Sequence, residues 1–169
     1  YTICYKNKDN TYSMYIFSSP IQYKTDTEYR IIDNTVIKSN KKGFAFENKA
    51  NNIRTYFPIT LSQPFRIEKE SDYLEFKPDW NIEGYSQAEK TIFTNMYGDN
   101  VSAVLYESND MNLIFYPTKA GIKMEIVLKK APVSNVFSFI VKSSIYSYEY
   151  KQNGYILFKN RGENHGIIY

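Results

Sequence analysis

In the segment IKMEIVLK, residues 122–129, every second residue is apolar, and most of the residues between them are charged. The apolar set is Ile122, Met124, Ile126 and Leu128. Because successive side chains of a β-strand point to opposite faces, this alternation predicts a strand with one buried face and one wet face. The wet face would carry Lys123, Glu125 and Lys129.

The same period of two recurs along most of the chain. Segments 64–70 and 72–77 alternate in the same way. The other candidate strands are 11–17, 28–33, 43–48, 53–57, 101–107, 111–116 and 136–142. Asn, Asp and Gly residues separate them at intervals of roughly 8–15 residues, which is typical of a β-sandwich or β-barrel.

The clearest local signal is a hairpin near the C-terminus. Two tyrosine-rich runs flank Asn153-Gly154, the residue pair preferred in a type I′ turn because both positions need φ > 0. We expect a turn at this pair, with segment 145–151 paired to segment 155–159. The resulting alternation would place Tyr146, Tyr148 and Tyr150 on one face, which we expect to be partly buried.

One segment, 86–96, also has features of a short helix, because Ser86-Gln87-Ala88-Glu89 could form a capping box. The β-branched residues Thr91 and Ile92 disfavour that helix. The predicted fold is therefore all-β, a sandwich of two mainly antiparallel sheets with about a dozen strands and at most one short helix.

Length and charge limit the classes of protein to consider. The chain has 169 residues and a net charge of +3, with 43% hydrophobic and 23% charged residues, which excludes a disordered chain. We expect one domain over residues 1–169. The weak, scattered positive charge predicts no nucleic-acid partner, and the lack of an apolar run of about 20 residues predicts no membrane insertion. Both ends look cut, which suggests a domain excised from a longer secreted protein.

The residues that usually carry catalysis are few. His165 is the only histidine and Cys4 the only cysteine, so neither a disulfide nor a zinc site can be assembled from them. Glu68 and Glu70 share a strand face, but Arg66 and Lys69 beside them suggest ordinary solvated charges. We therefore predict no catalytic residues, no cofactor and no metal; the alternative enzyme would be a glycosidase-type hydrolase.

Aromatic residues make up 17% of the chain, with 17 Tyr, 11 Phe and 1 Trp. Tyrosine suits wide sheet faces, where its ring packs and its hydroxyl reaches water. Flat rings with polar tips could also stack on sugars. The candidate ligand-binding aromatics are Trp80, Tyr85, Tyr146, Tyr148 and Tyr150, which Tyr97 and Tyr106 could extend.

Several segments resemble a known family. Residues 10–24, NTYSMYIFSSPIQYK, followed by YRIIDN at 29–34, resemble the opening of the region that precedes the repeats in bacterial RHS/YD-repeat and wall-associated proteins. Residues 46–58 and 112–129 are similar to later steps of the same region, and 165–169 to its closing strand. The chain departs from the family pattern at Tyr29, where a tryptophan is usual, and at Met124, where a glutamate is usual.

The resemblance implies an extracellular or cell-wall-associated bacterial module without known catalytic residues. Its first partner would be the rest of the same polypeptide. We therefore predict a non-catalytic structural or interaction module of a secreted repeat protein. The alternative is a carbohydrate-binding module that anchors the parent protein to wall or host glycans.

Overall fold

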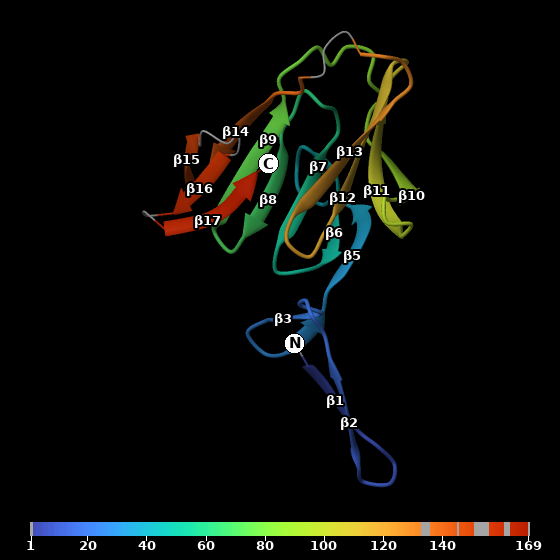
Figure 1. Ribbon diagram of the computed structural model, residues 1–169, viewed down its shortest axis with the longest axis vertical. Coiled ribbons are helices and arrows are strands. Elements are labelled where there is room, and N and C mark those ends of the chain that lie inside the picture. The colour runs from blue at the N-terminus through green and yellow to red at the C-terminus, as the bar shows by residue number, and fades with distance from the viewer. Residues whose placement is uncertain (1, 133–135, 145, 151–155, 161–162, 169) are drawn as a thin grey trace.

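The computed structural model describes residues 2–132, 136–144, 146–150, 156–160 and 163–168, the last three segments as strands only. No described residue is helical, and every strand pair in these ranges is antiparallel. Two larger sheets face each other and form a sandwich (Figure 1). This confirms the predicted all-β fold.

The first sheet of the sandwich has six strands in the order β14-β9-β8-β7-β6-β5. Their bounds are β5 Asp33–Lys38, β6 Phe44–Ala50, β7 Arg54–Pro58, β8 Phe65–Lys69, β9 Asp72–Pro78 and β14 Phe139–Ser143. Five of these strands follow one another along the chain. The sixth, β14, joins the edge at β9 only after the chain has built the second sheet.

The second sheet has four strands that follow one another as a meander. They are β10 Glu89–Thr94, β11 Asn100–Glu107, β12 Met111–Pro117 and β13 Ile122–Leu128. The IKMEIVLK segment is β13, and Ile122, Met124 and Ile126 pack against the buried core as its alternation predicts. Leu128, at the end of the strand, is 48% exposed.

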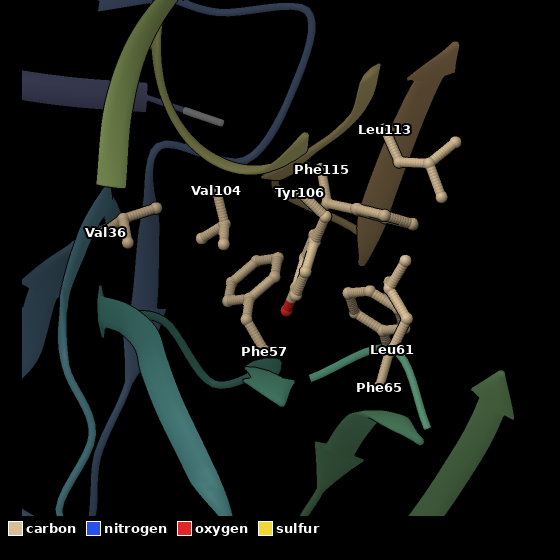
Figure 2. Close-up of a cluster of buried hydrophobic side chains, with 8 residues drawn as sticks. All are labelled: Val36, Phe57, Leu61, Phe65, Val104, Tyr106, Leu113 and Phe115. Carbon is tan, nitrogen blue, oxygen red and sulfur yellow. The ribbon is translucent and has the colours of Figure 1, made fainter. Parts of the chain in front are cut away.

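The core lies between the two sheets and is rich in aromatic rings. Its buried residues are Val36, Phe57, Leu61, Phe65, Val104, Tyr106, Leu113 and Phe115 (Figure 2). The Tyr106 hydroxyl donates a 2.7 Å hydrogen bond to the Pro58 carbonyl oxygen, so this buried polar group has a partner across the sandwich. Burial raises the pKa of Tyr106 and keeps the hydroxyl protonated.

Three smaller sheets lie outside the sandwich. Two are hairpins near the N-terminus, β1 Thr2–Lys6 with β2 Tyr12–Ile16 and β3 Gln22–Lys24 with β4 Tyr29–Ile31. The third contains β15 Tyr146–Tyr150, β16 Ile156–Asn160 and β17 Glu163–Ile168. Figure 1 shows the β1–β2 hairpin extending away from the sandwich.

The segment with a possible capping box forms a strand instead. Residues 89–94 are β10, which pairs with β11. The backbone N–H of Ser86 donates to the Glu107 carbonyl oxygen at 2.7 Å, and the Ser86 hydroxyl accepts from the Glu107 N–H at 2.9 Å. Ser86 thus binds the end of β11 rather than capping a helix.

The C-terminal hairpin pairs the two segments that were predicted to pair. Strand β15 runs antiparallel to β16, with Tyr150 opposite Ile156. A two-residue turn at Asn153-Gly154 would instead place Leu157 opposite Tyr150. The observed register therefore differs by one residue from the register that such a turn would give. This register leaves an odd number of residues between the paired ends. The Asn153-Gly154 pair itself lies outside the described residues.

A buried cluster of asparagines joins the turns at one end of the sandwich. Asn48 is fully buried; its amide nitrogen donates to the Ile53 carbonyl oxygen at 2.8 Å, and its oxygen accepts from the Thr55 N–H at 3.0 Å. Asn51, 3% exposed, donates to Asn34 Oδ1 at 3.2 Å. We call Asn34, Asn48 and Asn51 the asparagine clasp.

Replacing Asn48 by Ala should destabilise the fold by about 2–3 kcal/mol, because it removes the partners of the Ile53 carbonyl oxygen and of the buried Thr55 N–H. Urea unfolding measures this loss. Asn52→Ala, at the exposed neighbouring position, is the matched control and should change stability by less than about 0.5 kcal/mol. Equal effects of the two substitutions would contradict the role of the clasp.

Candidate interaction surface

The candidate aromatics Trp80 and Tyr85 lie in the connection between β9 and β10, where both are half-buried and pack against the core. The Trp80 ring makes edge-to-face contacts with Phe137 and Phe139, with ring centroids 5.5 and 5.1 Å away. Trp80 therefore packs against these two rings as well as the core, and Tyr85 packs against the core. Sugar binding by either residue stays a prediction.

The other candidate aromatics have different positions. Tyr106 belongs to the core and cannot meet a ligand. Tyr97 is 73% exposed, with Lys123 Nζ 4.7 Å from its ring centroid. Tyr146, Tyr148 and Tyr150 occupy alternate positions of β15, and His165 lies on β17; the side chains of all four lie outside the described part of the chain.

The outer face of the six-stranded sheet carries a row of charged and tyrosine side chains. Glu47 on β6, Tyr56 on β7, Arg66 on β8 and Glu75 on β9 are consecutive partners across the sheet. We call these four residues the charged row. Arg66 Nη1 donates to Glu75 Oε1 at 2.6 Å. The row thus joins four strands on the side away from the core.

Glu68 lies beside the charged row and is ion-paired rather than simply solvated. It accepts from Lys41 and from Arg66, and its side chain is only 18% exposed. Burial opposes ionisation of Glu68, but the hydrogen bonds and charges of Lys41 and Arg66 outweigh it and hold its pKa below 4.5. A general acid needs a raised pKa, so this environment suits an ion pair better than acid catalysis.

The arrangement at the N-terminus is different, because apolar side chains there face water. Eight of the sixteen large hydrophobic side chains that are exposed in the described residues lie between residues 5 and 31. They are Tyr5, Tyr12, Met14, Tyr15, Ile16, Phe17, Tyr29 and Ile31. Six of the eight belong to the β1–β2 hairpin or follow it directly. We call strands β1 and β2 with their turn the hairpin arm.

The hairpin arm has two faces, as the pairing register defines them. The Tyr15 face carries Ile3, Tyr5, Ser13, Tyr15 and the following Phe17. Here the Tyr5 ring meets the Tyr15 ring edge-on at 5.8 Å, and Ile3, Tyr5, Tyr15 and Phe17 line a shallow groove of about 300 Å³. The Met14 face carries Thr2, Cys4, Lys6, Tyr12, Met14 and Ile16.

Polar contacts order the tip of the arm. Asn7 Nδ2 donates to the hydroxyls of Thr11 and Ser13 at 2.8 and 3.0 Å. Asp9 Oδ1 accepts from the Thr11 N–H at 3.1 Å, and Asn10 adopts φ 66°. The turn is therefore built from polar residues, and the apolar surface lies along the strands.

The sequence predicted a strand over 11–17, which contains β2, but gave no prediction for β1. A signal was present, since Thr2-Ile3-Cys4-Tyr5-Lys6 precedes a turn that β2 follows. The exposure of the arm had no such signal, because alternating Tyr and Ile residues normally predict a buried face. A sequence pattern cannot show that a hairpin extends beyond its sheet.

Substituting Glu68 by Gln tests the ion pairs beside the charged row. Glu68 stabilises the fold above pH 4.5, and this contribution is lost as pH falls through its lower folded pKa, since the unfolded chain takes up the proton first. We expect the variant to lose about 1 kcal/mol at pH 7 and to show a weaker decline in stability under acid. Urea unfolding across pH measures both.

Glu70→Gln is the control for this substitution, because Glu70 is exposed in the β8–β9 turn. It should retain the acid dependence of the wild-type chain. An unchanged pH profile in Glu68→Gln would show that these ion pairs do not persist in solution.

Within the described residues, no group of three His, Cys, Asp or Glu side chains is placed to hold a metal ion. No helix found in those ranges is long and apolar enough to cross a membrane. No protein-family model, curated protein or solved structure matches the chain.

Proposed function

We propose that this chain is a non-catalytic interaction module that contacts another protein segment through its hairpin arm. The observation that carries the proposal is the exposure of Tyr12, Met14 and Ile16, which are 66%, 65% and 79% exposed on one side of the arm. Water-facing apolar side chains gathered on one element mark surfaces that bind. The arm extends away from the sandwich (Figure 1), and among the described residues the buried core of the sandwich contains none from the arm.

The architecture of the arm supports this function. A two-stranded hairpin is marginally stable in water, because it lacks a third strand and a covered apolar face. Both outer edges of the arm carry no strand among the described residues, since β1 and β2 form a two-stranded sheet. A bound protein segment would cover a face of the arm and add the missing contacts.

We also propose that the module belongs to a bacterial extracellular or cell-wall-associated repeat protein. Support comes from the resemblance of residues 10–34, which span β2, β3 and β4 and enter β5. Together with β1, this segment forms the part of the chain that precedes the sandwich, residues 2–32, which we call the N-terminal extension. Part of the resemblance therefore lies in the segment that extends away from the sandwich (Figure 1).

Panning a random-peptide phage library against the immobilised chain tests the binding role of the arm. The comparison variant replaces Tyr12, Met14 and Ile16 together by Thr, which retains β-propensity and removes apolar surface. We expect enriched peptides that bind the wild-type chain and bind this arm variant at least about tenfold more weakly, equivalent to about 1.4 kcal/mol.

The matched control replaces three exposed residues of the sandwich, Ile92, Val127 and Ile140, by Thr. Peptide binding should survive in this control, and circular dichroism should show both variants folded. Peptides that bind the arm variant as well as the wild type would contradict the proposal. Binding on a glycan array that is lost with Trp80→Ala or Tyr85→Ala would instead support a carbohydrate-binding module.

A further inference from the structure

We infer that the partner of the hairpin arm is a second copy of this chain, docked through the Met14 face. This inference rests on the proposed function and specifies its partner. Of the two faces, the Met14 face has less internal cover, with Tyr12, Met14 and Ile16 between 65% and 79% exposed. On the Tyr15 face the values are 54% for Tyr5 and Tyr15 and 37% for Phe17.

The Met14 face has a layout that complements itself under a two-fold axis. Its three cross-strand rows are Thr2–Ile16 at the base, Cys4–Met14 in the middle and Lys6–Tyr12 near the tip. When two arms lie face to face with their tips pointing in opposite directions, the middle rows meet at the axis. The tip row of each copy then covers the base row of the other, so the Tyr12 ring meets Ile16.

Charge permits this contact. Lys6 is the only charged residue within β1 and β2, and it lies on the Met14 face. In the two-fold arrangement the two Lys6 side chains lie at opposite ends of the interface. Each can extend its apolar stem over the base row of the partner while its ammonium group stays in water.

The area available matches a weak but specific dimer. All six side chains of the Met14 face are exposed, and covering every one of them in full would bury at most about 600 Å² per copy, or about 1,200 Å² in total. That is the lower limit of specific protein–protein interfaces, below which weak and transient contacts lie. We therefore expect reversible dimers with a dissociation constant in the micromolar range.

Sedimentation velocity under reducing conditions tests the association. Between about 1 µM and about 1 mM, the wild-type chain should shift from monomer to dimer. The arm variant, with Thr at positions 12, 14 and 16, should stay monomeric throughout. The sandwich control, with Thr at positions 92, 127 and 140, should dimerise as the wild type does. A wild-type chain that is monomeric at every concentration would overturn the inference, as would an arm variant that still dimerises.

Crosslinking of Cys4 tests the face-to-face arrangement independently, because Cys4 is exposed in the middle row of the Met14 face. Sheets packed face to face lie about 10 Å apart, too far for a direct disulfide between two Cys4 residues, but a short added bismaleimide can link the two thiols, each adding across one maleimide double bond. We expect crosslinked dimer to form at least about tenfold faster in the wild type than in the arm variant, which retains Cys4. Equal rates would show random collision and would overturn docking through this face.

The result separates the inference from the proposed function. A monomeric wild-type chain that still selects arm-dependent peptides from the phage library would overturn self-association and leave the interaction role standing. A monomeric chain that selects no such peptides would overturn both.

Discussion

Contact between aromatic rings across the sandwich is the constraint on which the rest of the structure depends. The ring of Phe65 on β8 lies 4.0 Å from that of Phe115 on β12, centroid to centroid, and this contact joins the two sheets. Phe65 also stacks on Phe76 at 5.1 Å and meets Tyr106 edge-on at 5.6 Å. Because aromatic pairs combine large buried area with preferred angles, this cluster fixes both the spacing and the relative orientation of the sheets.

The strands around this core could be predicted from sequence because their burial follows the pleat. Met124 and Ile126 alternate with Glu125, and the structure buries the first two toward the core as expected. Ser86 was ambiguous, since a hydroxyl before an acidic residue suits a helix cap and a strand-end hydrogen bond equally well. In the structure Ser86 binds the backbone of Glu107, which is 21 residues away in the sequence. The sequence around Ser86 therefore does not reveal this partner.

The candidate surface was much harder to predict. The hairpin arm uses the same residue types as the core, so composition alone assigns Tyr12 and Ile16 to the interior. Their exposure follows from the tertiary arrangement, in which the arm extends beyond the sheets (Figure 1). Trp80 shows a different case: its flat ring suggested a surface that stacks on sugars, and the structure adds edge-to-face contacts with Phe137 and Phe139 that the sequence did not predict.

The base of the N-terminal extension is held firmly where it meets the sandwich. Strand β4 ends at Ile31 and β5 begins at Asp33, so only Ile32 connects them, and its N–H donates to the Ile21 carbonyl oxygen at 2.9 Å. One residue further along, Asn34 accepts hydrogen bonds within the asparagine clasp. Such a short connection, bonded on both sides, restricts the directions in which the β3–β4 hairpin can point.

This restriction bears on how the arm can bind. A surface on a flexible linker loses conformational entropy when it docks, whereas a surface held in one orientation loses less. Lys119 Nζ in the β12–β13 turn donates to Ser19 Oγ at 2.7 Å and adds a contact between the second sheet and the segment that follows the arm. The buried polar groups at the end of the sandwich therefore do more than satisfy each other: they couple the stability of the core to the orientation of an apolar surface that has little core of its own.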